Sequence, residues 1–391
     1  MRILFVTWNV ASHYYHLVPL AWALRASGHE VCVASEPSFA EAITQSGMIA
    51  VPVGSGVPVE ELIARSRQRA AGRNEEDAVS GQGWSDDWKA AAARAFGMFT
   101  EWADTVLDDL IEFARSWRPD LVVYEPACFA GPLVAEAIGV PSARHLLGVD
   151  TTGMAAPIMP DLLAPLAERL GVQTSAGLGT VTIDNCPPSM QIPADVKRLV
   201  TRYIPYNGSG IIPDWSRDRD ALPRFLVTWG FSASSRGRSF LLPSILEALR
   251  DLPVEVMVTV SADDRDRLAT VPDNVRVVEA LPLHLILPTC DALIHQGGMG
   301  GILTALRHGV PQIIFPEMAD EMIEARQLEP TGAAIVVPRQ DADAAKLGEL
   351  ARSLLEDAAY REAAGRIRDE MLAQTPPAQL VPALERLASP S

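Results

Sequence analysis

The chain has 391 residues, of which 48% are hydrophobic and 21% are charged, proportions typical of a folded protein rather than a disordered one. Its 33 Lys and Arg against 49 Asp and Glu give a formal net charge of −16 at pH 7. Because no Lys- or Arg-rich run offsets this charge, the sequence argues against binding to nucleic acid or to an anionic membrane surface. No segment approaches the roughly 18–20 apolar residues of a membrane span, so we expect a cytoplasmic protein.

Short apolar runs alternate with helical patterns through the first half of the chain. Runs of this kind, separated by helices and bounded by turn residues, are typical of a parallel sheet that is covered on both faces. The expected helices are residues 17–26, 40–45 and 127–138. The expected strands are residues 3–7, 31–35, 49–53, 121–124 and 142–145.

The turn after the first strand contains two histidines, His13 and His16. We expect His13 to lie at the carboxyl end of that strand, where ligands of such sheets bind and where an imidazole can act as a general base. His16 lies one helical turn further on and is either the base itself or part of the wall of the site. The alternative for both is a hydrogen-bonded structural histidine.

One stretch interrupts the alternation of strands and helices. Residues 54–83 are rich in Gly, Arg, Glu and Ser, and they are followed by Trp84, Trp88 and a helical pattern over residues 87–115. Long segments inside compact domains often carry function. We therefore consider a lid over an apolar substrate, and the alternative is a mobile surface excursion.

The alternation restarts after residue 223 and predicts a second parallel sheet. Between the halves, residues 203–223 hold several prolines and glycines, a composition that favours a linker. Two doubly wound domains would leave a ligand-binding cleft at the carboxyl ends of their strands. The expected helices include residues 240–249 and 302–308, and the expected strands are residues 225–228, 254–260, 275–278, 292–294, 313–315 and 334–337.

The strongest local motif is HQGGMGG at residues 295–301, which joins an expected strand to an expected helix. Its four glycines let the backbone come close to a ligand, and the start of a helix presents free N–H groups. Together these features are typical of a phosphate site. We expect the imidazole of His295 to hydrogen-bond a diphosphate oxygen. The alternative is a turn that needs its glycines only for packing.

Asp320 and Glu321 follow another strand end, where carboxylates can accept hydrogen bonds from sugar hydroxyls or favour the first turn of the next helix. No metal site is predicted, because the four cysteines are scattered without zinc spacing and the Asp-x-Asp triplets are expected by chance among 49 acidic residues. The chain has no P-loop and no Gly-x-Gly-x-x-Gly motif after its first strand, which weighs against kinases and dehydrogenases.

Taken together, the motifs resemble those of the inverting glycosyltransferases with the GT-B fold, family GT1. Among these, the chain is most similar to the bacterial enzymes that glycosylate polyketide antibiotics, and the resemblance extends over nearly its whole length. It rests on Ser12-His13, on the turn at residues 28–31, on the linker entry at residues 202–208, and on residues 295–301 followed by Gly309-Val310-Pro311 and Asp320.

The resemblance implies a role for each candidate residue. His13 would deprotonate the acceptor hydroxyl, Leu281 would lie against the nucleotide base, and Asp320 with Glu321 would bind the donor sugar. The acceptor would be contacted by His16, Trp84 and Trp88. The donor diphosphate would be held by Ser232, His295, Gly297, Gly298, Met299 and Gly300.

The implied reaction is a single displacement with inversion, which moves a deoxysugar from a nucleoside diphosphate, in particular dTDP, to a hydroxyl group of a polyketide aglycone. No metal and no cofactor besides the nucleotide sugar would be required, because the start of a helix supplies positive potential. The partners would be small molecules, with no nucleic acid and no membrane, and a homodimer or an auxiliary activator protein is left open. The alternatives are a non-catalytic partner protein and a sugar-nucleotide epimerase on the same fold.

Three positions depart from the family pattern. Gly301 stands where Thr or Ser is usual, Phe231 replaces a small polar residue, and Glu321 replaces Gln or Asn. The first two predict weaker phosphate contacts or a changed donor pose, and the third predicts an unusual sugar. For the carboxylate that orients the base, the resemblance implies Glu125, which follows an expected strand and lies near the family's usual place, although Asp150 also qualifies.

The resulting fold class is α/β, with two doubly wound, Rossmann-like domains. We expect an acceptor-binding domain at residues 1–205, a linker at residues 206–223 and a donor-binding domain at residues 224–375. A final helix at residues 376–391 would cross back to the first domain.

Overall fold

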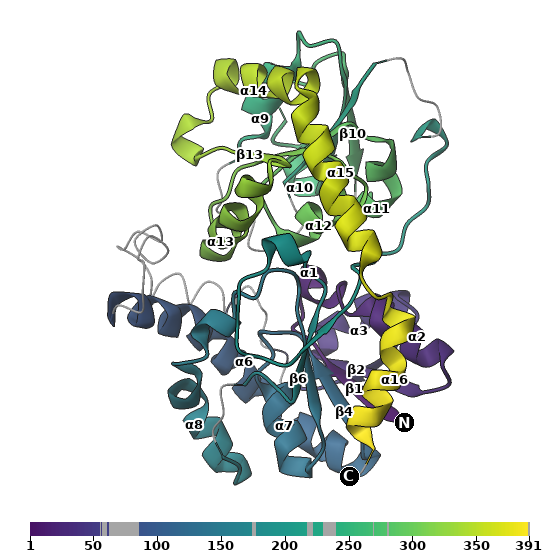
Figure 1. The fold of residues 1–391 in the computed structure, drawn as a ribbon, viewed down its shortest axis with the longest axis vertical. Coiled ribbons are helices and arrows are strands. Elements are labelled where there is room, and N and C mark those ends of the chain that lie inside the picture. The colour runs from purple at the N-terminus through teal and green to yellow at the C-terminus, as the bar shows by residue number, and fades with distance from the viewer. Residues whose placement is uncertain are drawn as a thin grey trace. The chain divides into compact units, whose positions relative to one another are not determined.

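The computed structural model describes residues 1–54, 56, 61, 86–173, 177–216, 222–229, 240–268, 270–279 and 281–389. They form two compact units (Figure 1), each with its own parallel sheet, which confirms the predicted α/β class. The first unit comprises Met1–Cys186, Ile192–Ile204 and Gln374–Ser391. The second unit comprises Pro187–Gln191 and Pro205–Ala373.

A seven-stranded parallel sheet with the strand order β3-β2-β1-β4-β5-β6-β7 forms the centre of the first unit. The inner strands are covered on both faces, so that all residues of β1 except the first are buried, as its continuous apolar sequence requires. The strands are β1 (Arg2–Val6), β2 (Glu30–Ser35), β3 (Ile49–Pro52), β4 (Leu121–Tyr124), β5 (Ser142–His145), β6 (Val181–Asp184) and β7 (Arg198–Val200).

The longest helix of the first unit is α6 (Asp86–Trp117), which packs into the core through Trp102, Val106 and Leu110 at a spacing of one helical turn. The last helix, α16 (Pro377–Ala388), packs against α2 (Val18–Ala26), although the two are far apart in the chain (Figure 1). The other helices described here are α1 (Ala11–Tyr14), α3 (Ala40–Gln45), α7 (Ala130–Ile138) and α8 (Met159–Leu170).

The second unit contains a six-stranded parallel sheet with the strand order β10-β9-β8-β11-β12-β13. The strands are β8 (Arg224–Thr228), β9 (Glu255–Val260), β10 (Val275–Glu279), β11 (Ala292–His295), β12 (Gln312–Ile314) and β13 (Ala334–Val336). The helices are α9 (Leu242–Leu249), α10 (Ala262–Arg265), α11 (Leu283–Ile286), α12 (Met299–Arg307), α13 (Ala319–Leu328), α14 (Ala344–Glu356) and α15 (Ala358–Ala373).

Every strand expected from the sequence is present, with each end within one residue of its predicted position. The sequence analysis did not identify β6 and β7. Thr and Asp interrupt the apolar pattern of β6, and β7 is an edge strand of only three residues, so neither shows a clear run.

The segment that was expected to be a linker is attached to the second unit at its start. The N–H of Asn207 donates to His284 Nδ1 at 3.1 Å, and the N–H of His284 donates to Asn207 Oδ1 at 3.0 Å. Most of the proposed lid, residues 54–83, lies outside the described residues. Among those described, no helix is long and apolar enough to cross a membrane.

Candidate active site

His13 and Glu125 meet at the carboxyl-end edge of the first sheet. His13 lies in α1, soon after β1, and Glu125 directly follows β4, the strand that pairs with β1. The Nδ1 atom of His13 lies 3.1 Å from Oε2 of Glu125. The His13 side chain keeps 22% of its surface exposed, whereas the Glu125 side chain is fully buried.

Glu125 is held in its ionised form by its neighbours. Burial by itself raises the pKa of this carboxyl, but the charge of His13 and hydrogen bonds from His13, Cys128 and Ala127 outweigh burial and lower the pKa below its usual value. An ionised carboxylate can only accept hydrogen bonds, so Nδ1 of His13 carries a proton, which in the neutral imidazole leaves the lone pair on Nε2. This tautomer is the one that a general base needs.

Asp150, the other carboxylate considered for this role, is engaged elsewhere. It accepts a hydrogen bond from Nη2 of the buried Arg144 at 2.7 Å and one from the N–H of Gly153 at 2.8 Å. Arg198 Nη2 lies 3.4 Å away on the same carboxylate oxygen as Arg144. Of the two candidates, therefore, Glu125 is the one that contacts His13.

Aromatic rings lie beside the His13 imidazole. The ring of Trp8 packs edge-on against it with 5.1 Å between centroids, and Phe99 of α6 packs edge-on against Trp8 at the same distance. Phe96, one helical turn before Phe99, has its ring 6.2 Å away, and both phenylalanines are partly exposed. Phe96 and Phe99 were not singled out from the sequence, although their spacing of one helical turn in a helical pattern was a usable signal.

His16 is a buried, uncharged residue. Burial, followed by the neighbouring His145 and His13, lowers the pKa of His16 to about 3. Its ring lies 5.5 Å from that of Tyr203, and Asn185 Nδ2 lies 3.5 Å from its Nδ1 atom. Because a group with so low a pKa is a weak base, His16 suits the wall of the site and not the base. Its contact with the acceptor stays a prediction.

In the second unit, residues 295–301 extend from the last residue of β11 through a turn at residues 296–298 into the first three residues of α12. Gly297 has a φ of +102°, a left-handed conformation that favours glycine. α12 begins after Gly298 without a side-chain cap, so the N–H groups of Met299 and Gly300 at its start are available to an anion. This geometry suits a diphosphate, and the binding itself stays a prediction.

His295 supports the glycine turn from its buried side. The residue is 1% exposed, its Nε2 atom donates to Gln312 Oε1 at 2.9 Å, and its Nδ1 atom accepts from the N–H of Gly297 at 3.3 Å. Burial lowers the pKa of His295 to about 4, so the ring is uncharged near neutral pH. Since both ring nitrogens have partners within the protein, His295 shapes the turn here, and its contact with a diphosphate stays a prediction.

The presence of glycine at position 301 has a steric explanation that the sequence alone did not show. A Cβ atom at this position would lie 2.8 Å from Nδ1 and 3.0 Å from Cε1 of His295, distances that real Cβ atoms rarely show. The packing of the His295 imidazole against the start of α12 therefore excludes Thr or Ser unless the ring moves.

Asp320 and Glu321 lie at the start of α13, next to the glycine turn. A Cβ atom built on Gly297 would lie 3.8 Å from Cβ of Glu321. The buried Glu321 carboxylate accepts hydrogen bonds from the N–H groups of Glu317 and Met318, each at 3.1 Å. Glu321 therefore stabilises the turn before the helix, the structural role considered for it, and Asp320 is the exposed carboxylate of the two.

The structure gives less information on the remaining predicted site residues. The Leu281 side chain is 5% exposed and packs in a core cluster with Leu226 and Ile286, so only its main chain is available to a nucleotide base. Ser232 and Trp84 lie outside the described residues. Trp88 belongs to α6, but its side chain also lies outside them.

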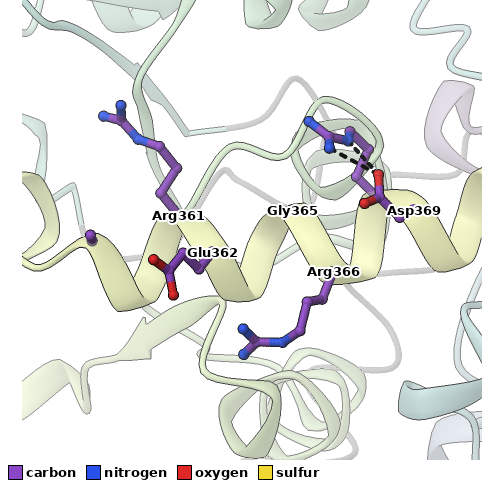
Figure 2. Close-up of a pocket in the computed structure, with 7 residues that line it drawn as sticks. Arg361, Glu362, Gly365, Arg366 and Asp369 are labelled. Atoms are coloured by element: carbon purple, nitrogen blue, oxygen red, sulfur yellow. Dashed lines mark hydrogen bonds and ion pairs between the residues drawn. The ribbon is translucent and has the colours of Figure 1, made fainter.

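Neither a metal cluster nor a second site emerges from the described part of the chain. No group of three or more His, Cys, Asp or Glu side chains converges there as a set of metal ligands. Figure 2 shows an open groove along α15 that includes Arg361, Glu362 and Arg366. Its side chains are charged and mostly exposed, and none of the candidate residues lines it.

Family models match both units of the chain. The model described as erythromycin biosynthesis protein CIII-like, N-terminal domain, matches residues 22–230, and the corresponding C-terminal domain matches residues 243–387. The 10-deoxymethynolide desosaminyltransferase of Streptomyces venezuelae is 37% identical, over 100% of this chain and 97% of the relative. The aclacinomycin-T 2-deoxy-L-fucose transferase of Streptomyces galilaeus is 36% identical, over 100% of this chain and 96% of the relative.

Solved structures agree with these relatives. The glycosyltransferase VinC in complex with dTDP superimposes with a TM-score of 0.83 at 32% identity, over 99% of each chain. The spinosyn rhamnosyltransferase SpnG complexed with spinosyn aglycone has a TM-score of 0.85 at 29% identity, over 98% of this chain and 100% of SpnG.

Proposed function

Since the chain belongs to the erythromycin biosynthesis protein CIII-like family of GT-B glycosyltransferases, we propose that it transfers a deoxysugar from dTDP to a hydroxyl group of a polyketide-type aglycone. The complex of VinC with dTDP supports the donor nucleotide. The complex of SpnG with spinosyn aglycone and the name of the desosaminyltransferase support the class of acceptor.

The hydrogen bond between His13 and Glu125 is the observation that carries the proposal. Glycosyl transfer to a hydroxyl group requires a base, and His13 combines an accessible imidazole with a buried carboxylate at 3.1 Å that stabilises the imidazolium once it forms. In the reaction, Nε2 of His13 takes the proton of the acceptor hydroxyl. The acceptor oxygen then bonds to the anomeric carbon while the bond from that carbon to the diphosphate breaks.

The start of α12 would stabilise the departing diphosphate. Negative charge grows on the diphosphate as its bond breaks, and uncapped N–H groups at a helix start act on such charge without reorganisation. His295 stabilises the turn before this helix through its hydrogen bond with the N–H of Gly297, and Gly297 adopts the positive φ that the turn requires. With this positive potential supplied by the helix, the reaction proceeds without a metal.

The apolar surface beside His13 would accept the aglycone. Trp8 packs against the ring of the proposed base, Phe99 packs against Trp8, and Phe96 lies next to Phe99. Aromatic rings of this kind suit a large apolar acceptor. Because one displacement occurs at the anomeric carbon, the configuration of the transferred sugar is inverted.

Two measurements on the purified protein test the proposal. Calorimetric titration with dTDP, UDP and NAD, in EDTA and in Mg²⁺, is expected to show binding of dTDP in preference to the others and without dependence on the metal. Incubation of a dTDP-deoxysugar with a macrolide aglycone in EDTA should yield a glycoside whose anomeric configuration, read by NMR, is opposite to that of the donor. A product with retained configuration, or no dTDP binding by folded protein, contradicts the proposal.

A further inference from the structure

Cys128 donates a hydrogen bond to Glu125, the carboxylate that contacts the proposed base. It lies in the turn between β4 and α7, is fully buried, and its Sγ atom donates to Glu125 Oε1 at 2.9 Å. The other oxygen of Glu125, Oε2, receives the Ala127 N–H at 2.9 Å and His13 Nδ1 at 3.1 Å. Each carboxylate oxygen therefore has a donor, and the three contacts together fix the orientation of the carboxylate.

The same sulfur is linked to the other neighbour of His13. The backbone N–H of Trp8 hydrogen-bonds to Cys128, while the Trp8 ring packs edge-on against the His13 imidazole. Burial, followed by the Glu125 charge, raises the pKa of the Cys128 thiol well above its usual value, so the thiol stays protonated and donates to the carboxylate. Cys128 thus connects the two groups that hold the His13 ring.

A thiol differs from a hydroxyl in a way that matters here. It is a weak hydrogen-bond donor, so it occupies Oε1 of Glu125 while drawing little charge from the carboxylate. More of that charge then remains to stabilise a protonated His13. A hydroxyl in the same place would donate more strongly and leave less of it.

We propose that Cys128 is a positioning residue for glycosyl transfer: it holds Glu125 in the orientation that receives His13 Nδ1–H, and it leaves Glu125 the negative charge that stabilises the imidazolium formed in the reaction. This inference rests on the proposed role of His13 as the base. Cys128 becomes a third residue of the site beside His13 and Glu125, and it lies three residues after Glu125 in the sequence.

The other titratable groups around the pair are few among the described residues. Glu125 interacts with His13 and Cys128, and His13 in turn neighbours His16. His16 neighbours His145 on β5, and burial lowers the pKa of His16 to about 3 and that of His145 to about 4. Both are therefore uncharged above pH 5, and they do not titrate in the range where the base is expected to act.

The test is the pH profile of kcat for Cys128→Ala and Cys128→Ser, measured with a saturating dTDP-sugar. Cys128→Ala leaves Oε1 without a donor, and we expect kcat to fall about tenfold with the KM for the donor unchanged. Cys128→Ser keeps a donor, so kcat returns to within about threefold of the wild type, with the acid limb of the profile moved to lower pH. Cys32→Ala and Cys32→Ser, at a buried position on β2 in the same core cluster, are the matched controls and should leave the profile unchanged.

Two results overturn the inference. One is a wild-type kcat and acid limb in both Cys128 variants. The other is a lower melting temperature in those variants with an unmoved profile, as a purely structural cysteine would give. His13→Ala in the same series separates this failure from that of the proposed function. If His13→Ala is inactive while the Cys128 variants match the wild type, only the proposed role of Cys128 is wrong. If His13→Ala turns over normally, His13 is not the base, and the proposed function of the site is wrong as well.

Discussion

His13 in the first unit and His295 in the second occupy comparable places, each at the carboxyl end of a central strand of a parallel sheet, but their surroundings differ. His13 is partly exposed and bonded to a buried carboxylate. His295 is 1% exposed, and both of its ring nitrogens are bonded to uncharged groups, the amide of Gln312 and the N–H of Gly297. One environment stabilises a protonated imidazole and the other opposes it.

A histidine at a strand end is therefore not by itself a candidate base. What separates the two residues is the charge and accessibility of their partners. His13 can take a proton from a substrate, and the ionised Glu125 beside it stabilises the charge that results. His295 contributes a rigid, neutral ring against which a glycine turn folds. The first unit accordingly suits proton transfer, and the second suits the binding of an anion.

Removal of the carboxylate that contacts His13 should have a large effect. Glu125→Gln keeps the size and an acceptor oxygen but loses the charge, so the imidazolium of His13 is no longer stabilised. We expect kcat to fall about 10²-fold, with the dissociation constant of dTDP unchanged. Steady-state kinetics and calorimetry on the same sample check this. Wild-type turnover by Glu125→Gln would contradict the distinction between the two histidines.

The pH dependence of stability tests the second environment. The pKa of His295 is about 4 in the folded protein, below the ordinary value of 6.5, so the unfolded chain binds more protons between these values. The stability from this residue is therefore complete above pH 6.5 and is lost as the pH falls towards 4. When the pH falls from 7 to 5, the unfolding free energy of the wild type should decrease by about 2 kcal/mol more than that of His295→Gln. Urea unfolding at both pH values measures the difference, and equal losses would show that the buried ring is not neutral.

Substitutions at Gly301 separate a steric reason from a chemical one. If the glycine is needed because the His295 ring packs against it, both Gly301→Ala and Gly301→Thr should weaken dTDP binding, by about tenfold. If the residue has only lost a hydroxyl that would contact phosphate, Gly301→Thr should bind dTDP more tightly than the wild type and Gly301→Ala should not. Calorimetric titration of the two variants distinguishes these outcomes.

The arrangement of strands could be predicted from the sequence because it depends on local patterns. Buried parallel strands are short apolar runs, and the glycine turn at residues 295–301 is a contiguous motif. β6 and β7 were not predicted, because polar residues interrupt the apolar pattern of β6 and β7 has only three residues. The positions of His13 and Glu125 followed in the same way, since Glu125 directly follows a predicted strand and His13 lies in the turn after another.

The partners of the site residues could not be predicted, because they depend on packing between distant segments. The sequence favoured Glu125 as the partner of the base and left Asp150 open, and it is the contact of Glu125 with His13 and the pairing of Asp150 with Arg144 that separate them. Nothing local in the sequence shows that Gly301 lies against His295, or that Glu321 bonds to backbone amides instead of remaining free. The contribution of Phe96 and Phe99 from α6 is equally non-local.

The most direct test of the account is to measure kcat and the dissociation constant of dTDP for both His13→Ala and His295→Ala. We expect His13→Ala to lower kcat by about 10²–10⁴-fold and to bind dTDP as the wild type does. His295→Ala should instead weaken dTDP binding and retain turnover when the donor is saturating. Normal turnover by His13→Ala, or unchanged dTDP affinity in His295→Ala, would contradict the division of proton transfer and anion binding between the two histidines.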